Sequence, residues 1–279
     1  MDRSPGDGDR APAEPPTATG LQIAPGTPAS DRPTTDRQTT GPPDEPRQRW
    51  RLVLRRSPEA ARLVQRETID AFETALAASG LPLVTSGKAR SRIMFGAALP
   101  AGMAADRELA DLVLADRVPV ADVRDRLATH LPAGWSLVEA FDVWLGEPSL
   151  VSQVVAAEYR VTLDGADAGR LWDAVAALLR ADSLPRRREK GGGSVAYDLR
   201  PLLDHVTVVS ADPATDPAVA DQAAADPAGV TLRLRTRMHP ELGTGRPEEV
   251  VAALGDELGV ALAVRSIVRE RLILAGDAG

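Results

Sequence analysis

Arginines at every second position of one short segment are the side chains best suited to bind a ligand in this sequence. In VTLRLRTR, Arg233, Arg235 and Arg237 alternate with smaller or apolar residues. Successive side chains of a β-strand point to opposite faces, so the three guanidinium groups share one face of a sheet. Such a face could bind the phosphates of a nucleic acid. The same arginines could instead pair with Glu158 or neighbouring acids on an exposed antiparallel sheet, and both interpretations remain open.

A second segment combines cationic side chains with glycine in the turn SLPRRREKGGGS. Glycines let backbone N–H groups approach a phosphate while the side chains neutralise its charge. A flexible hairpin tip whose charges only keep it hydrated is the alternative. The candidate residues are Arg186, Arg187, Arg188 and Lys190, followed by Gly191, Gly192 and Gly193.

Further candidate contacts to an anion, RNA or a partner lie outside these two segments. His239 follows the arginine-bearing strand, and Arg200 follows the glycine-containing turn. The basic loop SGKARSR adds Lys88, Arg90 and Arg92. Aromatic residues make up only 3% of the chain, whereas RNA-binding sheets of ferredoxin-like domains usually stack bases on Phe or Tyr. Contacts to phosphate are therefore favoured over contacts to bases.

The sequence does not indicate a catalytic centre. It contains no cysteine, which excludes disulfides, a thiolate zinc site, an iron–sulfur cluster held by this chain alone and a cysteine nucleophile. The histidines His130, His205 and His239 are far apart and lack metal-ligand spacing. Asp204 precedes His205 and could orient it, but no nucleophile accompanies the pair. We therefore predict no catalytic residue, no metal and no cofactor.

Length and charge restrict the class of protein. The 279 residues suffice for one large or two small domains. The formal net charge is -7, from 33 basic and 40 acidic residues, which is not the composition of a globally cationic nucleic-acid binder. No apolar run approaches the roughly 18 residues of a membrane-spanning helix. We expect a protein without a membrane span.

The first 48 residues differ in composition from the rest. They contain about ten of the 23 prolines and few apolar residues, which predicts a disordered tail. The segment lacks the apolar core of a secretory signal and is rich in acid for a mitochondrial presequence, so we predict a cytoplasmic protein.

After the tail, the hydrophobic period switches repeatedly between 2 and 3.6, as in mixed strands and helices. Trp50, Leu52 and Leu54 predict a strand with one buried face. Ser79 and Gly80 end the first helix, since glycine suits the left-handed position after a helix. The first repeat is predicted to have strands near 50–54, 81–85, 108–114 and 135–143, with helices near 69–79 and 120–131.

The same order recurs in the second half. Pro247 begins its last helix, with Glu248 and Glu249 at the positive end of the helix dipole. A stretch of Ala, Asp and Pro near 211–229 predicts a loop. The strands are predicted near 159–163, 195–199, 230–237 and 264–272, with helices near 171–179 and 247–258. The fold class is therefore α+β, with two tandem ferredoxin-like (βαββαβ) repeats, one spanning 49–148 and the other 149–279.

Several ordered strings resemble a bacterial family. They are AFETALAASGLPLV, AALPAG, LPAGW, VVAAEYRVTL, REKGGGSVAYDLRPLL, HPELGTGRPEEVV and IVRERLIL. Together they resemble the radical SAM-linked family with the DUF2344 domain, whose members are fused to, or encoded beside, a radical SAM protein. The resemblance covers about residues 49–275 and implies a radical SAM protein as partner.

This chain departs from the family pattern at two places. Members often have Ser-His-Leu-Asp before the first helix, where this sequence has Val64, Gln65, Arg66 and Glu67. They also tend to have a histidine- and proline-containing phrase where this chain has SGKARSR. The chain resembles a divergent member that lacks the N-terminal histidine motifs, which implies a partner more than a reaction.

Two functions follow from these observations. The first is a non-catalytic accessory partner of a radical SAM enzyme that contributes RNA or substrate binding in RNA modification or maturation. The alternative is an RNA-processing enzyme, since tandem ferredoxin-like units also build CRISPR-type endonucleases, an analogy of fold alone. Cleavage of structured RNA by the purified protein distinguishes the two. The sequence leaves the RNA target and the oligomeric state open.

Overall fold

The structure is a computed structural model that describes residues 46–86, 90–91, 93–190, 192–209 and 229–277. Most of the predicted tail, residues 1–45, lies outside this part of the chain. The predicted loop near 211–229 lies outside it too, except for Gly229. In the described ranges, no helix has the length and apolar character needed to cross a bilayer.

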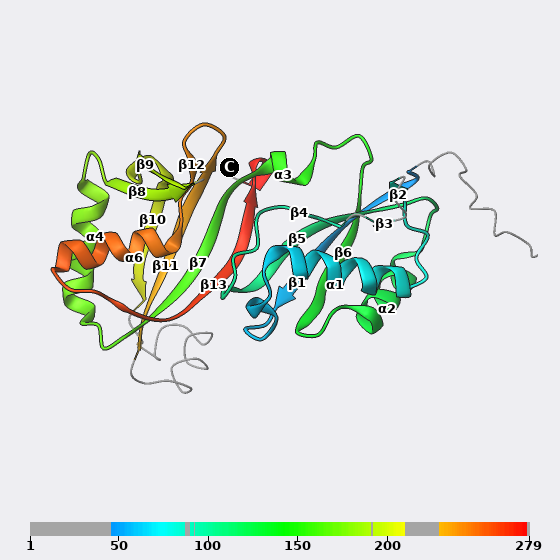
Figure 1. The fold of residues 1–279 in the computed structure, drawn as a ribbon, viewed down its shortest axis with the longest axis horizontal. Helices are drawn as coiled ribbons and strands as arrows, with labels where there is room; N and C mark the ends of the chain where they lie inside the picture. Colours follow the sequence, from blue (N-terminus) through cyan, green and yellow to red (C-terminus); the bar gives the residue numbers. More distant parts are fainter. Residues whose placement is uncertain (1–45, 87–89, 92, 191, 210–228, 278–279) are drawn as a thin grey trace, which may run out of the picture. The chain divides into compact units, whose positions relative to one another are not determined.

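One mixed sheet of nine strands organises the described residues (Figure 1). Its strands follow the order β10-β11-β7-β13-β5-β1-β6, with β12 beside β11 and β4 beside β5. The strands are β1 (Gln48–Arg56), β4 (Met94–Phe95), β5 (Ala104–Leu114), β6 (Trp135–Val143), β7 (Val154–Asp164), β10 (Leu203–Val209), β11 (Gly229–His239), β12 (Gly243–Thr244) and β13 (Ala263–Leu274).

Helices pack on the sheet, and two small strand pairs lie apart from it. The helices are α1 (Gln65–Ala78), α2 (Val120–His130), α3 (Leu150–Gln153), α4 (Ala168–Arg180) and α6 (Pro247–Leu258). The separate pairs are β2 (Thr85–Ser86) with β3 (Arg90–Ser91), and β8 (Pro185–Lys190) with β9 (Gly193–Asp198). Short 3-10 turns lie at Ala60–Arg62, Arg200–Leu202 and Ala275–Asp277. The fold is therefore a mixed α+β structure.

In the first half, β1 lies between β5 and β6 and pairs antiparallel with both. The apolar face of β1 packs on α1 and α2, as the alternation of Trp50, Leu52 and Leu54 predicts. Phe72 of α1 makes edge contacts with Phe95 and Trp135, at centroid distances of 5.3 and 4.9 Å. These contacts build one of two hydrophobic clusters in the described chain.

The strand expected at 81–85 is present only in part, as a short pairing beside the end of β5. The Val84 N–H donates to the Val113 carbonyl, and the Ala115 N–H donates to the Pro82 carbonyl. Leu83 makes one isolated bridge to Leu114, and β4 pairs with β5 further along. Pro82 lacks a backbone N–H and so cannot donate to a ladder. The helix end before it is correct, since Gly80 takes the left-handed φ of 66°.

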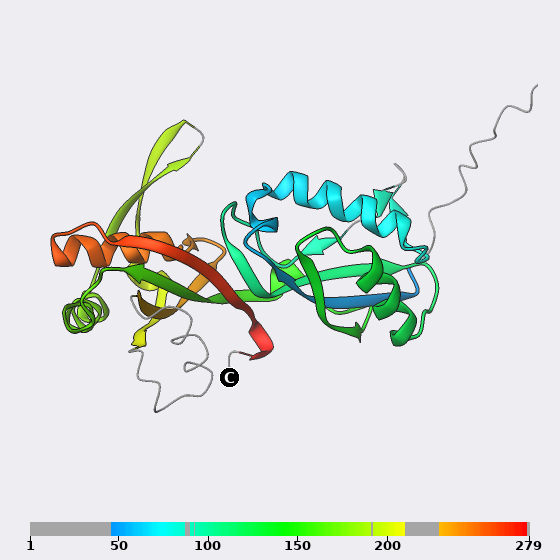
Figure 2. The ribbon, with the colours of Figure 1, turned by 90° about the horizontal axis from the view of Figure 1, so that it is seen from below.

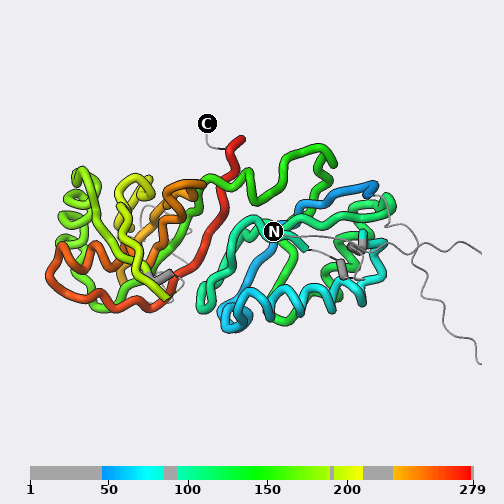
Figure 3. The backbone as a smooth tube through the Cα atoms, turned by 45° about the horizontal axis from the view of Figure 1, so that its top comes forward, coloured from blue at the N-terminus to red at the C-terminus, as the bar shows by residue number. Residues whose placement is uncertain are grey.

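In the second half, α4 and α6 cover one face of the strands (Figure 1). The four main strands have the order β10-β11-β7-β13, and every neighbouring pair is antiparallel. The paired strands β7 (green) and β13 (red) can be followed in Figure 3. The helix α6 starts at Pro247 and ends before Gly259, whose φ is 67°, as the sequence predicts.

A strand is present near the expected 195–199, but it does not join the main sheet. These residues form β9, which pairs only with β8 in a hairpin extending away from the sheet (Figure 2). The sheet position belongs to β10, where Leu203, Val206 and Val208 are buried. A register shift between Leu203 and His205 interrupts the alternation, which explains why the sequence pattern does not indicate this strand.

The two halves are joined within the sheet by a short parallel pairing. Val268 and Arg269 of β13 pair with Ala104 and Ala105 of β5. The buried guanidinium of Arg269 forms an ion pair with buried Glu108 and donates a 2.9 Å hydrogen bond to the Ala98 carbonyl. Because a buried charge needs its partner, this pair favours one register between the halves.

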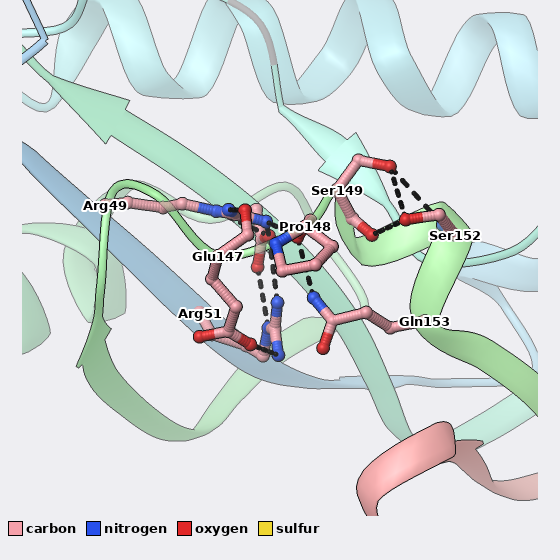
Figure 4. A network of polar contacts seen from close by, with 8 residues as sticks. Arg49, Arg51, Glu147, Pro148, Ser149, Ser152 and Gln153 are labelled. Carbon is pink, nitrogen blue, oxygen red and sulfur yellow. Dashed lines mark hydrogen bonds and ion pairs between the residues drawn. The ribbon is translucent and has the colours of Figure 1, made fainter.

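The connection between the halves crosses the face of β1 opposite the helices (Figure 4). Arg49 donates hydrogen bonds to the backbone carbonyls of Glu147 and Pro148, at 2.7 and 3.0 Å. Arg49 and Arg51 both bond the fully buried carboxylate of Asp111. The expectation of a single buried face on this strand is therefore wrong, since Arg49 and Arg51 are buried under the connection.

Candidate functional site

The arginines of β11 lie on the sheet face opposite α4 and α6. Arg233 and Arg237 are exposed, whereas Leu232 and Leu234 are buried in the helix-covered core. This arrangement confirms the predicted alternation. Arg233, Arg235 and Arg237 therefore lie together on one face, which no helix of the described residues covers.

Each of these arginines has an acidic partner on another strand of the sheet. Arg235 bonds Glu158 of β7 at 2.5 Å, and Arg237 bonds Asp204 of β10 at 2.6 Å. Arg233 lies 3.8 Å from Glu270 of β13. Pairing with Glu158, which the sequence left open, is thus present.

The pairing continues across the sheet. Arg271 bonds Glu158 at 2.6 Å, and Arg160 bonds Glu270 at 2.7 Å. Asp106 accepts a hydrogen bond of 3.0 Å from Arg160, and its carboxylate lies 3.8 Å from the guanidinium of Arg55. We call these ten residues the ion-pair face: Arg55, Arg160, Arg233, Arg235, Arg237 and Arg271, with Asp106, Glu158, Asp204 and Glu270.

The ion-pair face has more positive than negative charge. Its six arginines face four carboxylates, a surplus of two positive charges on a chain whose net charge is -7. The carboxylates are 21% to 32% exposed, whereas five of the six arginines are 37% to 67% exposed. A molecule approaching from solvent therefore meets guanidinium groups first.

Glu158 is the most shared carboxylate of the face. Its hydrogen bond from Arg271 lowers its pKa below the usual value, and the bond from Arg235 adds to this effect. The same pair raises the pKa of Arg271. Glu158 therefore stays ionised and holds two guanidinium groups in place, while each guanidinium keeps N–H donors for a further acceptor.

An open groove of about 620 Å³ lies in this face. His205 and Thr207 of β10 line it together with Arg233 and Arg235. The ring of His205 contacts the Thr207 hydroxyl, while Asp204 pairs with arginines. The described contacts do not join Asp204 to His205, the pair that would be needed for acid–base chemistry.

The β8–β9 hairpin holds two of its arginines against α6. Arg188 donates to Glu249 at 2.8 and 3.0 Å and lies over the Tyr197 ring, 4.5 Å from its centroid. Arg186 forms an ion pair with Asp256 at 3.2 Å. Burial, followed by the nearby Glu249, raises the pKa of Tyr197 to about 12. Arg187 is exposed and bonds only Ser194 among the described contacts.

The other predicted contact residues are dispersed. Arg200 donates to the carbonyls of Leu179, Ala181 and Leu203, so its guanidinium holds the end of α4. His239 accepts backbone N–H bonds from Glu241 and Leu242 after β11. Gly192 has a φ of 83° in the hairpin turn, next to Gly193. Outside the described residues are Lys88, Arg92 and Gly191 and the side chains of Arg90 and Lys190.

Residues 49–233 match the family model described as "Uncharacterized protein conserved in bacteria (DUF2344)". The chain belongs to this family. No match was found among curated proteins.

The chain also matches solved structures at low similarity. A Cbf5-Nop10-Gar1 complex matches with a TM-score of 0.44 and 11% identity, covering 80% of this chain and 48% of that chain. The archaeal box H/ACA sRNP Nop10-Cbf5 complex matches with a TM-score of 0.40 and 11% identity, covering 80% and 47%. The chain thus spans about half the length of these solved chains, and nothing about its activity follows from them.

Five contributors to the ion-pair face of the DUF2344 protein were missed by sequence reasoning: Arg55, Asp106, Arg160, Glu270 and Arg271. Arg160 and Glu158 stand two residues apart in EYR, the period of one strand face, which is a usable signal. Asp106 and Glu270 could not be placed, since their contact with Arg160 depends on how β5, β7 and β13 are ordered.

Proposed function

We propose that this DUF2344 protein is a non-catalytic accessory protein that binds RNA through the ion-pair face and acts beside a radical SAM enzyme in RNA modification or maturation. The observation that carries the RNA part is the surplus of two guanidinium groups on an uncovered sheet face, with the cations outermost. RNA phosphates are acceptors that such groups bind well.

The mode of binding follows from the composition of the face. The ten residues of the face are arginines and carboxylates, so phosphate contacts outnumber any stacking of a base on the His205 ring in its groove. Phosphate contacts position a nucleic acid without reading its sequence. We expect binding that depends steeply on salt and weakly on sequence.

Each half is proposed to be a ferredoxin-like repeat, with boundaries at 49–148 and 149–279. The order β10-β11-β7-β13 supports this for the second half, since α4 follows β7 and precedes β10 in the chain, and α6 connects β11 to β13. In the first half, the order β4-β5-β1-β6 supports it, although β4 has only two residues. A repeat of this kind leaves one sheet face free of helices.

The partner is proposed from the family resemblance. A radical SAM cluster is held by three cysteine thiolates, and this chain contains no cysteine. The cluster would therefore belong to the partner. A cytoplasmic location and contacts of the hairpin arginines with RNA or this partner remain predictions of the same proposal.

Fluorescence anisotropy with a labelled single-stranded RNA tests the RNA part. Replacing Arg233, Arg235 and Arg237 by serine should weaken binding at least tenfold at low salt, because the substitutions remove three cations from the face. The matched control replaces Arg117 and Arg124, which lie away from the sheet face, and should bind like the wild type. Equal affinity of the triple variant and the wild type would contradict the proposal.

Two further measurements test the remaining parts. Incubation with structured RNA should leave the RNA intact, whereas cleavage would favour the processing enzyme. Co-expression with the radical SAM protein encoded nearest to the gene should give a co-purifying complex. Failure to co-purify, together with unchanged activity of that enzyme when this protein is added, would contradict the accessory role.

A further inference from the structure

A large cavity lined by described residues lies on the other side of the sheet. Its volume is about 990 Å³, at the upper end of the range for pockets that take organic ligands. It is lined by the segment 96–103, by α3 and the start of β7, and by the chain from Met238 to Glu249. Tyr159 and Arg269 also line it.

The walls of this cavity are mainly apolar. Leu99, Met103 and Val154 line it and are buried in the protein. Met238 and Pro247 complete an apolar surface that comes from both halves of the fold. Such walls favour a ligand with a substantial apolar body.

The charged groups at the cavity divide into paired and unpaired ones. Arg269 is paired with Glu108, and Glu249 with Arg188. In the described part of the chain, the side chains of Arg246 and Glu248 make no hydrogen bond or ion pair. The cavity therefore offers, within the described residues, one free cation and one free anion.

A neutral donor accompanies these two charges. The Nδ1 atom of His239 accepts two backbone N–H bonds of 3.2 Å, so in the neutral ring the proton resides on Nε2. His239 lines the cavity, and its Nε2–H is left as a donor.

Segments that carry the family resemblance also converge here. AALPAG contributes Ala97 and Leu99, VVAAEYRVTL contributes Val154 and Tyr159, and HPELGTGRPEEVV contributes the chain from His239 to Glu249. These segments are far apart in the sequence and meet at one cavity.

We propose that this cavity binds a small zwitterion with a large apolar body, of the kind presented by apolar amino acids and short apolar peptides. The ligand carboxylate pairs with Arg246, its ammonium group pairs with Glu248, and its apolar body lies against Leu99, Met103 and Met238. This site is separate from the ion-pair face, because none of the ten residues of that face lines the cavity.

Methyl NMR on protein labelled at methionine reads this site directly. The chain has four methionines, of which Met103 and Met238 line the cavity, while Met94 does not and serves as an internal control. Signals are assigned with Met103→Leu and Met238→Leu. L-phenylalanine and the tripeptide Leu-Phe-Leu, added to about 10 mM, should shift the signals of Met103 and Met238 in a saturable way.

Matched probes separate the two charges. N-acetyl-L-phenylalanine keeps only the carboxylate, and L-phenylalaninamide keeps only the ammonium group. Arg246→Ala should weaken the first roughly tenfold and leave the second unchanged, whereas Glu248→Gln should do the reverse. Arg124→Ala and Glu257→Gln, at exposed positions on α2 and α6, should change neither.

The outcomes decide both the site and the ligand source. Binding of phenylalanine alone assigns a free amino acid, and binding of the tripeptide alone assigns a peptide, each with the proposed chemistry. The proposal is overturned if no probe shifts Met103 or Met238, or if binding is insensitive to both Arg246→Ala and Glu248→Gln. RNA affinity is measured in parallel and should not change in these two variants.

Discussion

Two strands of this protein have arginines at alternate positions on the face opposite the helices, with opposite results. On β1, Arg49 and Arg51 are buried, and they share the Asp111 carboxylate beneath the connection between the halves. On β11, Arg233 and Arg237 remain exposed. The alternation of arginine is therefore not sufficient to define a binding surface. Where a connecting segment covers such arginines, as on β1, they stabilise the fold and are not available to a ligand.

The difference in burial predicts a difference in energy. A buried ion pair that loses one partner leaves an uncompensated charge, whereas exposed pairs contribute little. The first half therefore depends on its arginine–carboxylate network for stability. In the second half the corresponding groups are available to a ligand.

The largest expected effect on stability comes from removing the Asp111 carboxylate, and it is compared with removal of the Asp204 carboxylate from the ion-pair face. Asp111→Ala leaves Arg49 and Arg51 buried without their shared partner and should lower the free energy of unfolding by about 3–5 kcal/mol. Asp204→Ala, on the ion-pair face, should lower it by less than about 1 kcal/mol. Urea denaturation of both variants measures the contrast, and comparable decreases would show that burial does not separate the two networks.

A smaller loss of stability is expected from Glu147, which pairs with Arg51 at the partly exposed edge of the buried network. Glu147 is 30% exposed and bonds Arg51 at 3.3 Å, so Glu147→Gln should cost about 1 kcal/mol. Arg49 still bonds the backbone carbonyls of Glu147 and Pro148, which should keep the connection in place. The control is Glu139→Gln, which breaks an exposed pair with Arg107 and should cost less than about 0.5 kcal/mol. A larger decrease in the free energy of unfolding for Glu139→Gln than for Glu147→Gln would contradict the proposed contribution of the Arg51–Glu147 pair.

The smallest expected effect is a change in how stability depends on pH in acid. The pKa of Glu158 is lowered in the folded protein by its bond from Arg271. The contribution of Glu158 to stability is therefore fully present above the unfolded value of about 4.3 and is lost as the pH falls through the lower folded pKa. Glu158→Gln should flatten the pH dependence of unfolding below about pH 4.5, measured by urea denaturation from pH 5 to 3. Glu257→Gln, at an exposed position, should leave that dependence as in the wild type.

Local signals explain what the sequence could predict. The strand β11 follows from an alternation and the helix α6 from Pro247 and its apolar period, all of which lie within the element. The strand β10 was missed because its alternation is interrupted by a register shift after Leu203. Because β10 was missed, residues 195–199 were assigned its place in the sheet.

Long-range contacts explain what it could not predict. The burial of Arg49 depends on carbonyls 98 and 99 residues away. The sharing of Asp106, Glu158 and Glu270 depends on the order of strands in the sheet. Three of the predicted ligand contacts, Arg186, Arg188 and Arg200, have protein partners that no local pattern indicates.

The salt dependence of RNA binding tests the central claim most directly. For a single strand, each cation that binds a phosphate contributes roughly 0.7 to the steepness of log affinity against log salt. Serine at positions 233, 235 and 237 should therefore reduce the steepness by about 2 relative to the wild type. An unchanged slope, with RNA affinity retained, would show that RNA binds elsewhere and that the ion-pair face is not its site.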